Sequence, residues 1–384
     1  MRIIYLTTSL CEDDYNEFTK LWKITLNPSN QNFHNKMIRA LSIYYPVDVI
    51  SLRPFSRTKC RVVKLQKEKT VKDNVTYHYL AVGGPSLLRA HSFKKQAARI
   101  LNSIELEDTV ILSDTINPKA ISVANYLKKK FSLPLVGVCT DSPSNISNTR
   151  RSYTLYLMKK SKDLDGYIGL TKELVDLFNS ENRPSMVIEG LVENKLPEPI
   201  ENKYGDYLFF GGALMRRYGI YDLISAFKKI DNSDLKLLIC GHHADEEGLK
   251  KAMNGDKRIV YLKRLPVKKV LQLEMNAIGS INPRPFSEDL DRYSIPSKTI
   301  EYLSSGRPVI SVKNSKLQKK FMEEIIWSKS SNEDELATAI NRLLSLNKKE
   351  QQDLGKRAQE KVLSLYSLPV AGKEITDFIS QFVN

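Results

Sequence analysis

The sequence of 384 residues has few cysteines, few histidines and no long apolar run. Its four cysteines have no paired spacing, which predicts neither a disulfide framework nor a zinc site. The pair His242-His243 has no third ligand at a useful spacing. No apolar run approaches the roughly 20 residues that span a bilayer, and the start of the chain becomes polar too early for a signal peptide. We therefore expect a cytoplasmic protein without a metal, a cofactor or a membrane span.

The charge of the chain is its most evident compositional feature. The formal net charge is +15 at pH 7. Residues 1–190 carry 28 Lys and Arg against 18 Asp and Glu, and the remainder carries 31 against 26. A basic N-terminal half suits an anionic membrane surface or a phosphate-bearing substrate, although a generally basic proteome would also explain it. No basic motif interleaved with aromatic residues supports a nucleic acid partner.

Apolar strands alternate with helical patterns along the whole chain, which predicts an α/β fold with parallel sheets. Residues 1–192 form the expected first domain and residues 207–365 the second. The segment 193–206, which contains Pro and Glu and has little periodicity, is the expected linker. We expect residues 11–31 to be a polar loop. The basic run 53–76 is typical of a solvated loop or hairpin, or of a segment that contacts a membrane surface.

One stretch in the second half predicts a strand, a loop, a helix and another strand. A helix that opens at Pro296 or Ser297 is expected to close at Gly306, in a left-handed conformation that a Cβ would oppose. Apolar runs at 277–282 and 309–312 flank it as strands. This order is a βαβ unit, which places the helix N-terminus at the ligand-binding edge of the sheet.

The start of that helix has the chemistry of a nucleotide diphosphate site. Its unpaired N–H groups and positive dipole end suit phosphate, and Lys298 adds a charge. Glu301, one turn further, has a carboxylate that can accept hydrogen bonds from two vicinal hydroxyls, as on a ribose. An ordinary helix with a solvated glutamate would have the same pattern.

The run from Pro296 to Ile310 resembles the donor-site motif of family-4-like glycosyltransferases with the GT-B fold, as in bacterial capsule and exopolysaccharide synthesis. That motif has two glutamates with seven residues between them. Glu301 matches the second, which holds the donor ribose, and the first, which contacts the sugar, falls on Tyr293. The resemblance also places Ser297, Lys298 and Thr299 at the donor.

A second part of the resemblance is a strand that runs into the glycine loop Gly211-Gly212. The family usually has an Arg and a Lys on the donor diphosphate, at positions that are Ala213 and Tyr218 in this chain. We expect Arg216 and Arg217 to supply that charge instead; the alternative is that they are solvated arginines at a helix start. We also expect Gly241 and Arg284, which follow strands on the same side of the domain, to contact the donor.

Polar residues at strand ends of the first domain are the candidates for acceptor binding. Asn30 and Gln31 open a helix after the first strand, in a loop without the family's usual Gly-Gly; their alternative role is to cap that helix. Asp114 and Asp141 follow two later strands, where open α/β sheets bind ligands. We favour Asp141 as the residue that touches the acceptor or the anomeric centre; its alternative role is to cap the turn before Pro143.

The resemblance implies two Rossmann-like domains that face each other across a cleft, with residues 366–384 returning to the first. It implies transfer of a hexose from a nucleotide sugar, with retention of configuration. For catalysis we expect Asp141 at the reacting groups, and stabilisation of the leaving diphosphate by Arg216 or Arg217, Lys298 and the helix dipole. We expect a lipid-diphosphate-linked saccharide acceptor and a peripheral location at the inner face of the plasma membrane. The alternatives are a GT-B sugar-nucleotide epimerase and a non-catalytic partner protein that binds a sugar nucleotide or a membrane.

Overall fold

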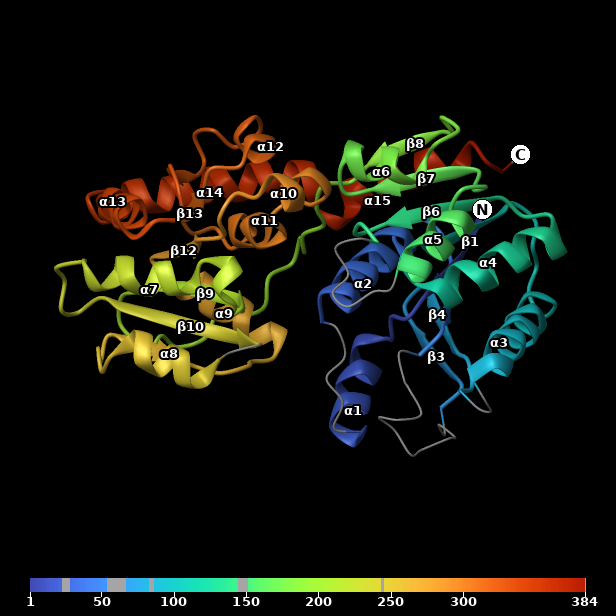
Figure 1. Cartoon of the computed structure of the whole chain (residues 1–384), viewed down its shortest axis with the longest axis horizontal. Coiled ribbons are helices and arrows are strands. Elements are labelled where there is room, and N and C mark those ends of the chain that lie inside the picture. Colours follow the sequence, from blue (N-terminus) through green and yellow to red (C-terminus); the bar gives the residue numbers. More distant parts are fainter. Residues whose placement is uncertain (23–27, 54–66, 83–85, 144–150, 243–244, 384) are drawn as a thin grey trace. The chain divides into compact units, whose positions relative to one another are not determined.

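A computed structural model describes residues 1–22, 28–53, 67–82, 86–143, 151–242 and 245–383. The chain divides into two compact units (Figure 1). The first consists of residues 1–191, 292–294 and 368–384, and the second of residues 192–291 and 295–367. The expected α/β fold with two mostly parallel sheets is confirmed.

The sheet of the first unit has the strand order β3-β4-β2-β1-β5-β6-β7-β8. All neighbouring pairs are parallel except β3 and β4, which form a hairpin that begins in the basic run and ends three residues beyond it. Residues 54–66 of that run lie outside the described residues. The strands are β1 (Arg2–Thr7), β2 (Val47–Ser51), β3 (Lys69–Lys72), β4 (Val75–Tyr79), β5 (Thr109–Asp114), β6 (Leu135–Cys139), β7 (Gly166–Gly169) and β8 (Ser185–Val187).

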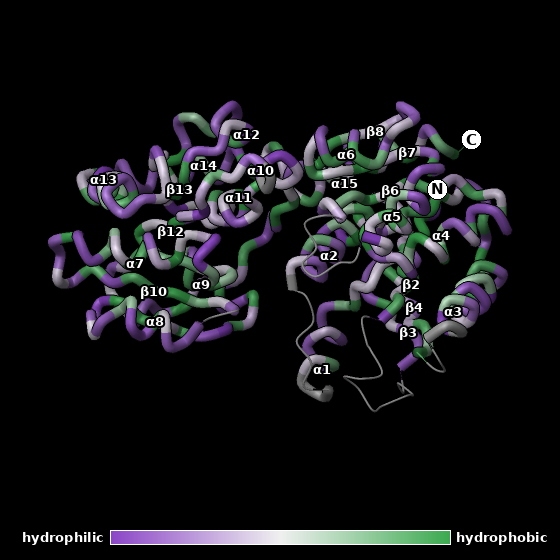
Figure 2. Tube along the Cα trace, in the orientation of Figure 1, coloured by the Kyte–Doolittle hydropathy of each residue, from purple (hydrophilic) through white to green (hydrophobic). Residues whose placement is uncertain are grey.

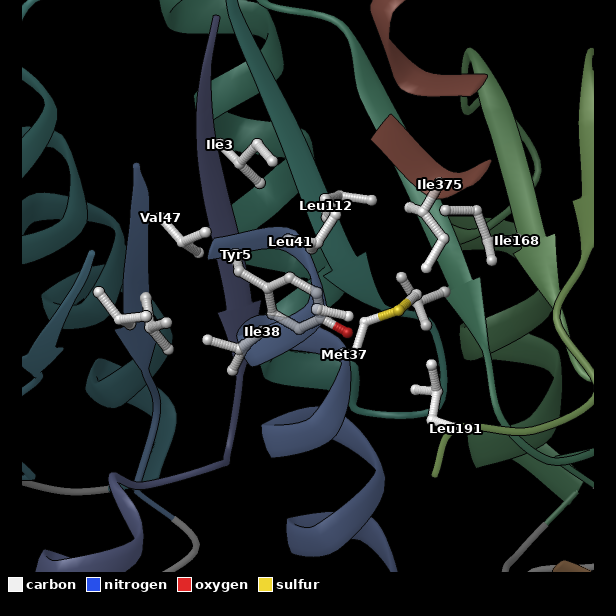
Figure 3. Close-up of a cluster of buried hydrophobic side chains, with 14 of the residues drawn as sticks. Ile3, Tyr5, Met37, Ile38, Leu41, Val47, Leu112, Ile168, Leu191 and Ile375 are labelled. Carbon is white, nitrogen blue, oxygen red and sulfur yellow. The ribbon is translucent and has the colours of Figure 1, made fainter. Parts of the chain in front are cut away.

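Helices cover both faces of this sheet. They are α1 (Glu12–Trp22), α2 (Pro28–Ser42), α3 (Ser86–Leu101), α4 (Pro118–Phe131), α5 (Arg151–Lys160), α6 (Lys172–Phe178) and α15 (Leu368–Ser380). Successive strand residues point to opposite faces, so Ile3 and Tyr5 pack with α2 and α15, whereas Ile4 and Leu6 pack with α3 and α4. Figure 3 shows the first of these clusters, where Tyr5 lies among Met37, Ile38 and Leu41.

The second unit has a parallel sheet with the strand order β11-β10-β9-β12-β13-β14. Its strands are β9 (Tyr207–Ala213), β10 (Lys236–His242), β11 (Ile259–Tyr261), β12 (Gly279–Asn282), β13 (Val309–Val312) and β14 (Ile326–Ser328). From β9 the chain proceeds outward to β10 and β11, and from β12 it proceeds outward in the other direction. The point between β9 and β12 is therefore the topological switch point of this sheet.

Two helical layers enclose this second sheet, and the apolar residues lie between the layers (Figure 2). On one face lie α7 (Ile220–Lys228), α8 (Glu246–Met253) and α13 (Glu333–Leu344); on the other lie α9 (Val267–Asn276), α11 (Ser297–Ser304) and α14 (Lys348–Tyr366). Short elements complete the unit: η1 (Arg216–Tyr218), α10 (Glu288–Tyr293) and α12 (Ser315–Gln318). The last residues of α10 group with the first unit.

The expectation of a polar loop at residues 11–31 is wrong. The structure has α1 from Glu12 to Trp22, and α2 begins at Pro28. The reason is a long-range contact: Asp14 of α1 accepts hydrogen bonds from Lys67, Thr70 and Tyr79. A local pattern of charged residues does not reveal partners more than fifty positions away, so the helix was not recognisable from its sequence.

Candidate functional site

The carboxyl ends of β9 and β12 are the place where an open α/β sheet of this topology binds its ligand. The glycines Gly211 and Gly212 lie at the end of β9, and Asn282 ends β12. Helix α11 follows β12 through the loop that contains Arg284. The residues expected to bind a donor are therefore distributed around one switch point, with the exception of Tyr293, whose position is described below.

A chain of buried hydroxyl and amide groups fixes the first turn of α11. Asn282 Nδ2 of β12 donates to Thr299 Oγ1 at 2.7 Å, and Thr299 Oγ1 lies 3.2 Å from Ser311 Oγ of β13. No described side chain caps the helix at Pro296, so the N–H groups around Ser297 remain available to an anion.

Lys298 carries a positive charge that two carboxylates hold in place. Its Nζ donates to Glu301 Oε1 at 2.7 Å, and the fully buried Glu274 of α9 acts on it electrostatically. Burial favours the neutral amine, but the attraction of Glu301 and Glu274 outweighs it and raises the pKa of Lys298 well above its ordinary value. Lys298 is thus a fixed cation beside the start of α11.

Tyr302 attaches α11 to the glycine loop. Its hydroxyl accepts a hydrogen bond from Gly211 N at 2.9 Å and donates one to Gly211 O at 3.1 Å. Burial raises the pKa of this hydroxyl well above its ordinary value, so it stays a neutral donor and acceptor. The helix that carries Lys298 and Glu301 is therefore positioned directly against the end of β9.

Close backbone packing explains two of the glycines at this edge. Gly241 has φ +157°, and a Cβ there would lie 1.7 Å from Gly212 O. Gly219 has φ +76°, and a Cβ there would lie 2.2 Å from Pro283 O. Gly219 thereby lets the loop after β9 approach the loop after β12, which brings Arg216 and Arg217 near the same strand ends.

Arg216 and Arg217 lie in η1 as exposed residues. The Arg216 guanidinium lies over the Tyr221 ring at 4.2 Å from its centroid, and Arg217 lies over Tyr218 at 5.0 Å. Neither arginine forms an ion pair with another described residue. Both guanidinium groups are thus held by aromatic rings, which leave their N–H donors free to bind an anion.

Arg284 is held by a carboxylate that the sequence pattern did not single out. Arg284 Nη2 donates to Asp291 Oδ1 at 3.0 Å. Asp291 is only 4% exposed and also accepts from Asn314 Nδ2 at 3.1 Å and from Ser287 N at 2.8 Å. Asp291 therefore organises the loop after β12. Arg284 can contact a ligand only while its guanidinium group is also held by Asp291.

Tyr293 belongs to a different environment from Glu301. Residues 292–294 group with the first unit, and Tyr293 lies partly buried against the apolar cluster of that unit. The position that the family motif assigns to the donor sugar is thus occupied by a ring that packs against apolar side chains.

The first unit brings Asp114 together with a histidine that was not predicted. Asp114 ends β5, is buried, and accepts a hydrogen bond from Ile116 N at 3.0 Å. Its Oδ2 lies 3.4 Å from His34 Nε2, and His34 Nδ1 lies 2.8 Å from the Tyr5 hydroxyl. His34 comes from α2, so no local spacing connects it with Asp114.

The other acceptor candidates have structural partners. The Gln31 side chain accepts from Leu10 N at 3.0 Å and donates to Leu10 O at 2.6 Å, which holds the loop after β1. Asn30 Oδ1 accepts from Thr8 Oγ1 at 3.3 Å. Asp141, half-buried after β6, accepts from Ser142 N at 2.7 Å, as in the turn-capping alternative.

Neither a metal cluster nor a membrane span was found in the described part of the chain. None of its groups of His, Cys, Asp and Glu has the three members needed to hold a metal ion. None of its helices is long and apolar enough to cross a membrane. His243 of the histidine pair lies outside the described residues.

Many solved structures resemble the whole chain, among them the following three. Sucrose-phosphate synthase from Thermosynechococcus elongatus matches with a TM-score of 0.68 and 15% identity, over 99% of this chain and 98% of that one. Anabaena Alr3699/HepE, solved with UDP and glucose, matches with a TM-score of 0.67 and 12% identity, over 99% and 100%. An E. coli structure described as trehalose-6-phosphate bound with UDP-2-fluoro glucose matches with a TM-score of 0.68 and 10% identity, over 99% of both chains. At such identities the likeness establishes the fold, which is GT-B.

The sequence comparison is confined to the second half. No curated protein matches the chain. The family model described as "Glycosyl transferases group 1" matches residues 193–361, which include the glycine loop, Lys298 and Glu301. Residues 193–361 thus have the sequence pattern of glycosyl transferases group 1, within a chain that has the GT-B fold.

Proposed function

We propose that this protein is a glycosyltransferase that binds a nucleotide-diphosphate sugar at the carboxyl ends of β9 and β12. The observation that carries the proposal is the arrangement of Lys298 and Glu301 on α11. This helix has an uncapped N-terminus, is attached to the glycine loop through Tyr302, and lies within the segment that matches glycosyl transferases group 1. A cation, free amides and a carboxylate within two helical turns suit a diphosphate and a ribose together.

Each group has a distinct part in the proposed reaction. The amides at Ser297 and the charge of Lys298 bind the diphosphate, and Arg216 and Arg217 approach it from the loop after β9. Glu301 accepts hydrogen bonds from the ribose hydroxyls and exchanges part of its bond with Lys298 for them. As the bond between sugar and diphosphate breaks, negative charge grows on the leaving oxygen, and these fixed cations stabilise it without a strong protein base.

The acceptor is proposed to bind the first unit, near the strand ends that carry Asp114 and Asp141. This acceptor is proposed to be a lipid-diphosphate-linked saccharide, because the N-terminal half carries most of the excess positive charge. This acceptor implies a role in surface polysaccharide synthesis and a peripheral location at an anionic membrane. Transfer with retention of configuration is part of the same proposal.

A non-catalytic sugar-nucleotide-binding protein is the second candidate. The position of Tyr293 favours it, because this residue packs in an apolar cluster where the motif has a sugar-binding glutamate. Such a protein would bind the donor and neither hydrolyse it nor transfer the sugar.

Nucleotide binding followed by donor turnover tests the proposal. Thermal stability is measured with UDP, GDP, dTDP and CMP, with UDP first because several solved structures of this fold contain UDP or a UDP sugar. We expect one nucleotide to stabilise the protein and Glu301→Ala to abolish that shift. Release of the nucleotide from its sugar conjugate, with or without an acceptor, then separates the enzyme from the non-catalytic protein. If no nucleotide shifts the stability, the donor site is wrongly assigned.

A further inference from the structure

A cationic groove lies between α3 and α4 in the first unit. Figure 1 shows where these two helices lie in that unit. Its volume is about 350 Å³. Its lining combines side chains from both helices: His91, Lys94, Lys95, Ala98, Arg99, Asn102, Tyr126 and Lys130. The groove is separate from the residues proposed to bind the donor and the acceptor.

All charged residues of the two helices that form the groove are positive. Each carries four Lys or Arg, and neither has a single Asp or Glu. Within the described chain, none of the four cations of the groove (Lys94, Lys95, Arg99 and Lys130) forms an ion pair with a carboxylate. In contrast, Lys128, which also lies on α4, donates to Asp165 at 2.7 Å. The positive charge of the groove is therefore not neutralised by the described protein groups that surround it.

An aromatic ring holds two of these charges together. Lys94 Nζ of α3 lies 5.7 Å from the centroid of the Tyr126 ring, and Lys130 Nζ of α4 lies 5.9 Å from the same centroid. A ring attracts each ammonium group, but two like charges near one ring repel each other. An anion between them would remove that repulsion and gain charge-assisted hydrogen bonds.

The helix dipole explains only some of these cations. Lys128, Lys129 and Lys130 lie in the last turn of α4, where a positive charge is favourable in any helix. Lys94 and Lys95 lie in the middle of α3, where the dipole gives no such benefit. The dipole therefore does not account for their placement beside Lys130, where a bound anion would be stabilised by all three charges.

The groove also faces away from the expected acceptor edge. In a βα unit the helix runs antiparallel to its strand, so the C-terminal part of the helix lies near the amino ends of the strands. The groove uses residues 91–102 of the α3 region and residues 126–130 of α4. Asp114 lies at the opposite end of β5, so the groove is a separate site.

We infer that the groove between α3 and α4 binds a phosphate-bearing anion. Lys94 of α3 and Lys130 of α4, which both lie near the Tyr126 ring, bind it from the two helices. Lys95 and Arg99 supply further charge on the same side of α3. Phosphate esters of this kind occur as soluble polyphosphorylated compounds and as lipid headgroups at a membrane surface. The site and its cations are the same for both sources.

Binding of inorganic pyrophosphate to the full chain tests the inference. Calorimetry is done with a saturating concentration of the nucleotide that stabilises the protein, so that any binding of pyrophosphate at the donor site is blocked. The test variant is Lys94→Gln with Lys130→Gln. The control variant is Lys348→Gln with Lys349→Gln, which removes the same charge from an exposed part of α14. We expect the affinity to fall about tenfold or more in the test variant, because both ammonium groups that bind the anion from the two helices are lost, and to change less than about twofold in the control.

Vesicle flotation distinguishes the two sources of the anion. Vesicles of phosphatidylglycerol are compared with vesicles of phosphatidylcholine, for the same two variants. Flotation with phosphatidylglycerol that is lost in the test variant, kept in the control and inhibited by pyrophosphate identifies a headgroup. Pyrophosphate binding without flotation identifies a soluble ligand.

Equal effects of the test and control variants on both measurements would overturn the inference, because the binding would then follow net charge alone. A nucleotide-dependent thermal shift measured on the same variants keeps the two proposals apart. We expect that shift to be unchanged when Lys94 and Lys130 are replaced. If no nucleotide produces a shift, the proposed donor site fails, and the result for the groove stands independently.

Discussion

Lys298 Nζ donates to Glu301 Oε1 at 2.7 Å across one turn of α11. This pair combines the two chemical functions that a nucleotide diphosphate needs, a cation for phosphate and a carboxylate for vicinal hydroxyls. Its position follows from the chain that links Asn282, Thr299 and Ser311 below the first turn of the helix. The strand ends therefore determine where the charges of α11 lie.

Glu301→Gln is predicted to weaken nucleotide binding while the fold is kept. The amide has the shape of the carboxylate but loses the charge that attracts the ribose hydroxyls, and such charged hydrogen bonds are worth roughly 1.5–3 kcal/mol. We expect the Kd for the preferred nucleotide to rise about tenfold or more. Calorimetry with that nucleotide measures it, with Glu374→Gln, an exposed change on α15, as the control. An unchanged Kd would exclude Glu301 from the donor site.

Glu274→Gln is predicted to destabilise the second unit. Glu274 is fully buried and helps to keep Lys298 charged, so its removal leaves that ammonium with one carboxylate. Because the Lys298 side chain is 36% exposed, water compensates part of the loss, and we expect the free energy of unfolding to fall by about 1–2 kcal/mol. Urea unfolding measures the change. When Lys298 is already replaced by Met, Glu274→Gln should lower the free energy of unfolding by less. An equal decrease with and without Lys298 would show that Glu274 does not act through Lys298.

The sequence predicted the elements whose ends are set by local chemistry. Helix α11 ends before Gly306, which has φ +74° as expected, and β13 runs from Val309 to Val312. Lys298 and Glu301 could be predicted to lie together because they lie on one short helix; their role at the donor stays a prediction. His34 and Glu274 were missed because their partners lie far away in the sequence, and nothing in a single segment indicates such a contact. Helix α1 was missed for the same reason, since its Asp14 is held by β3 and β4.

Gly219→Ala is predicted to lower the free energy of unfolding by more than the strain of its left-handed backbone conformation alone would. The new Cβ would lie 2.2 Å from Pro283 O, so the loops after β9 and β12 would have to move apart. Gly205 has a similar φ of +73° and nothing within 4 Å of its Cβ position, which makes Gly205→Ala a matched control for backbone strain. We expect a loss of about 1 kcal/mol for the control and at least about 2 kcal/mol for Gly219→Ala. Thermal or urea unfolding compares them, and equal losses would show that the loops accommodate the methyl group.

Asp14 is predicted to make the first unit sensitive to acid. Burial raises the pKa of Asp14, but hydrogen bonds from Lys67, Tyr79 and Thr70 outweigh it, so the net shift is below the ordinary value of 3.8. A carboxyl group with a lowered pKa contributes stability that is fully present above its unfolded pKa. That contribution is lost as the pH falls below about 3.8 and through the folded value.

Asp14→Asn tests this pH dependence. We expect the stability difference between the natural protein and the variant to be constant from about pH 7 to pH 5 and to shrink as the pH falls through about 3.8 towards 3. Urea unfolding across this range, followed by tyrosine fluorescence, measures that difference. Asp234→Asn, at an exposed position of the second unit, provides the control. If the difference stays the same down to about pH 3, the Asp14 carboxylate is not what attaches α1 to the hairpin of β3 and β4.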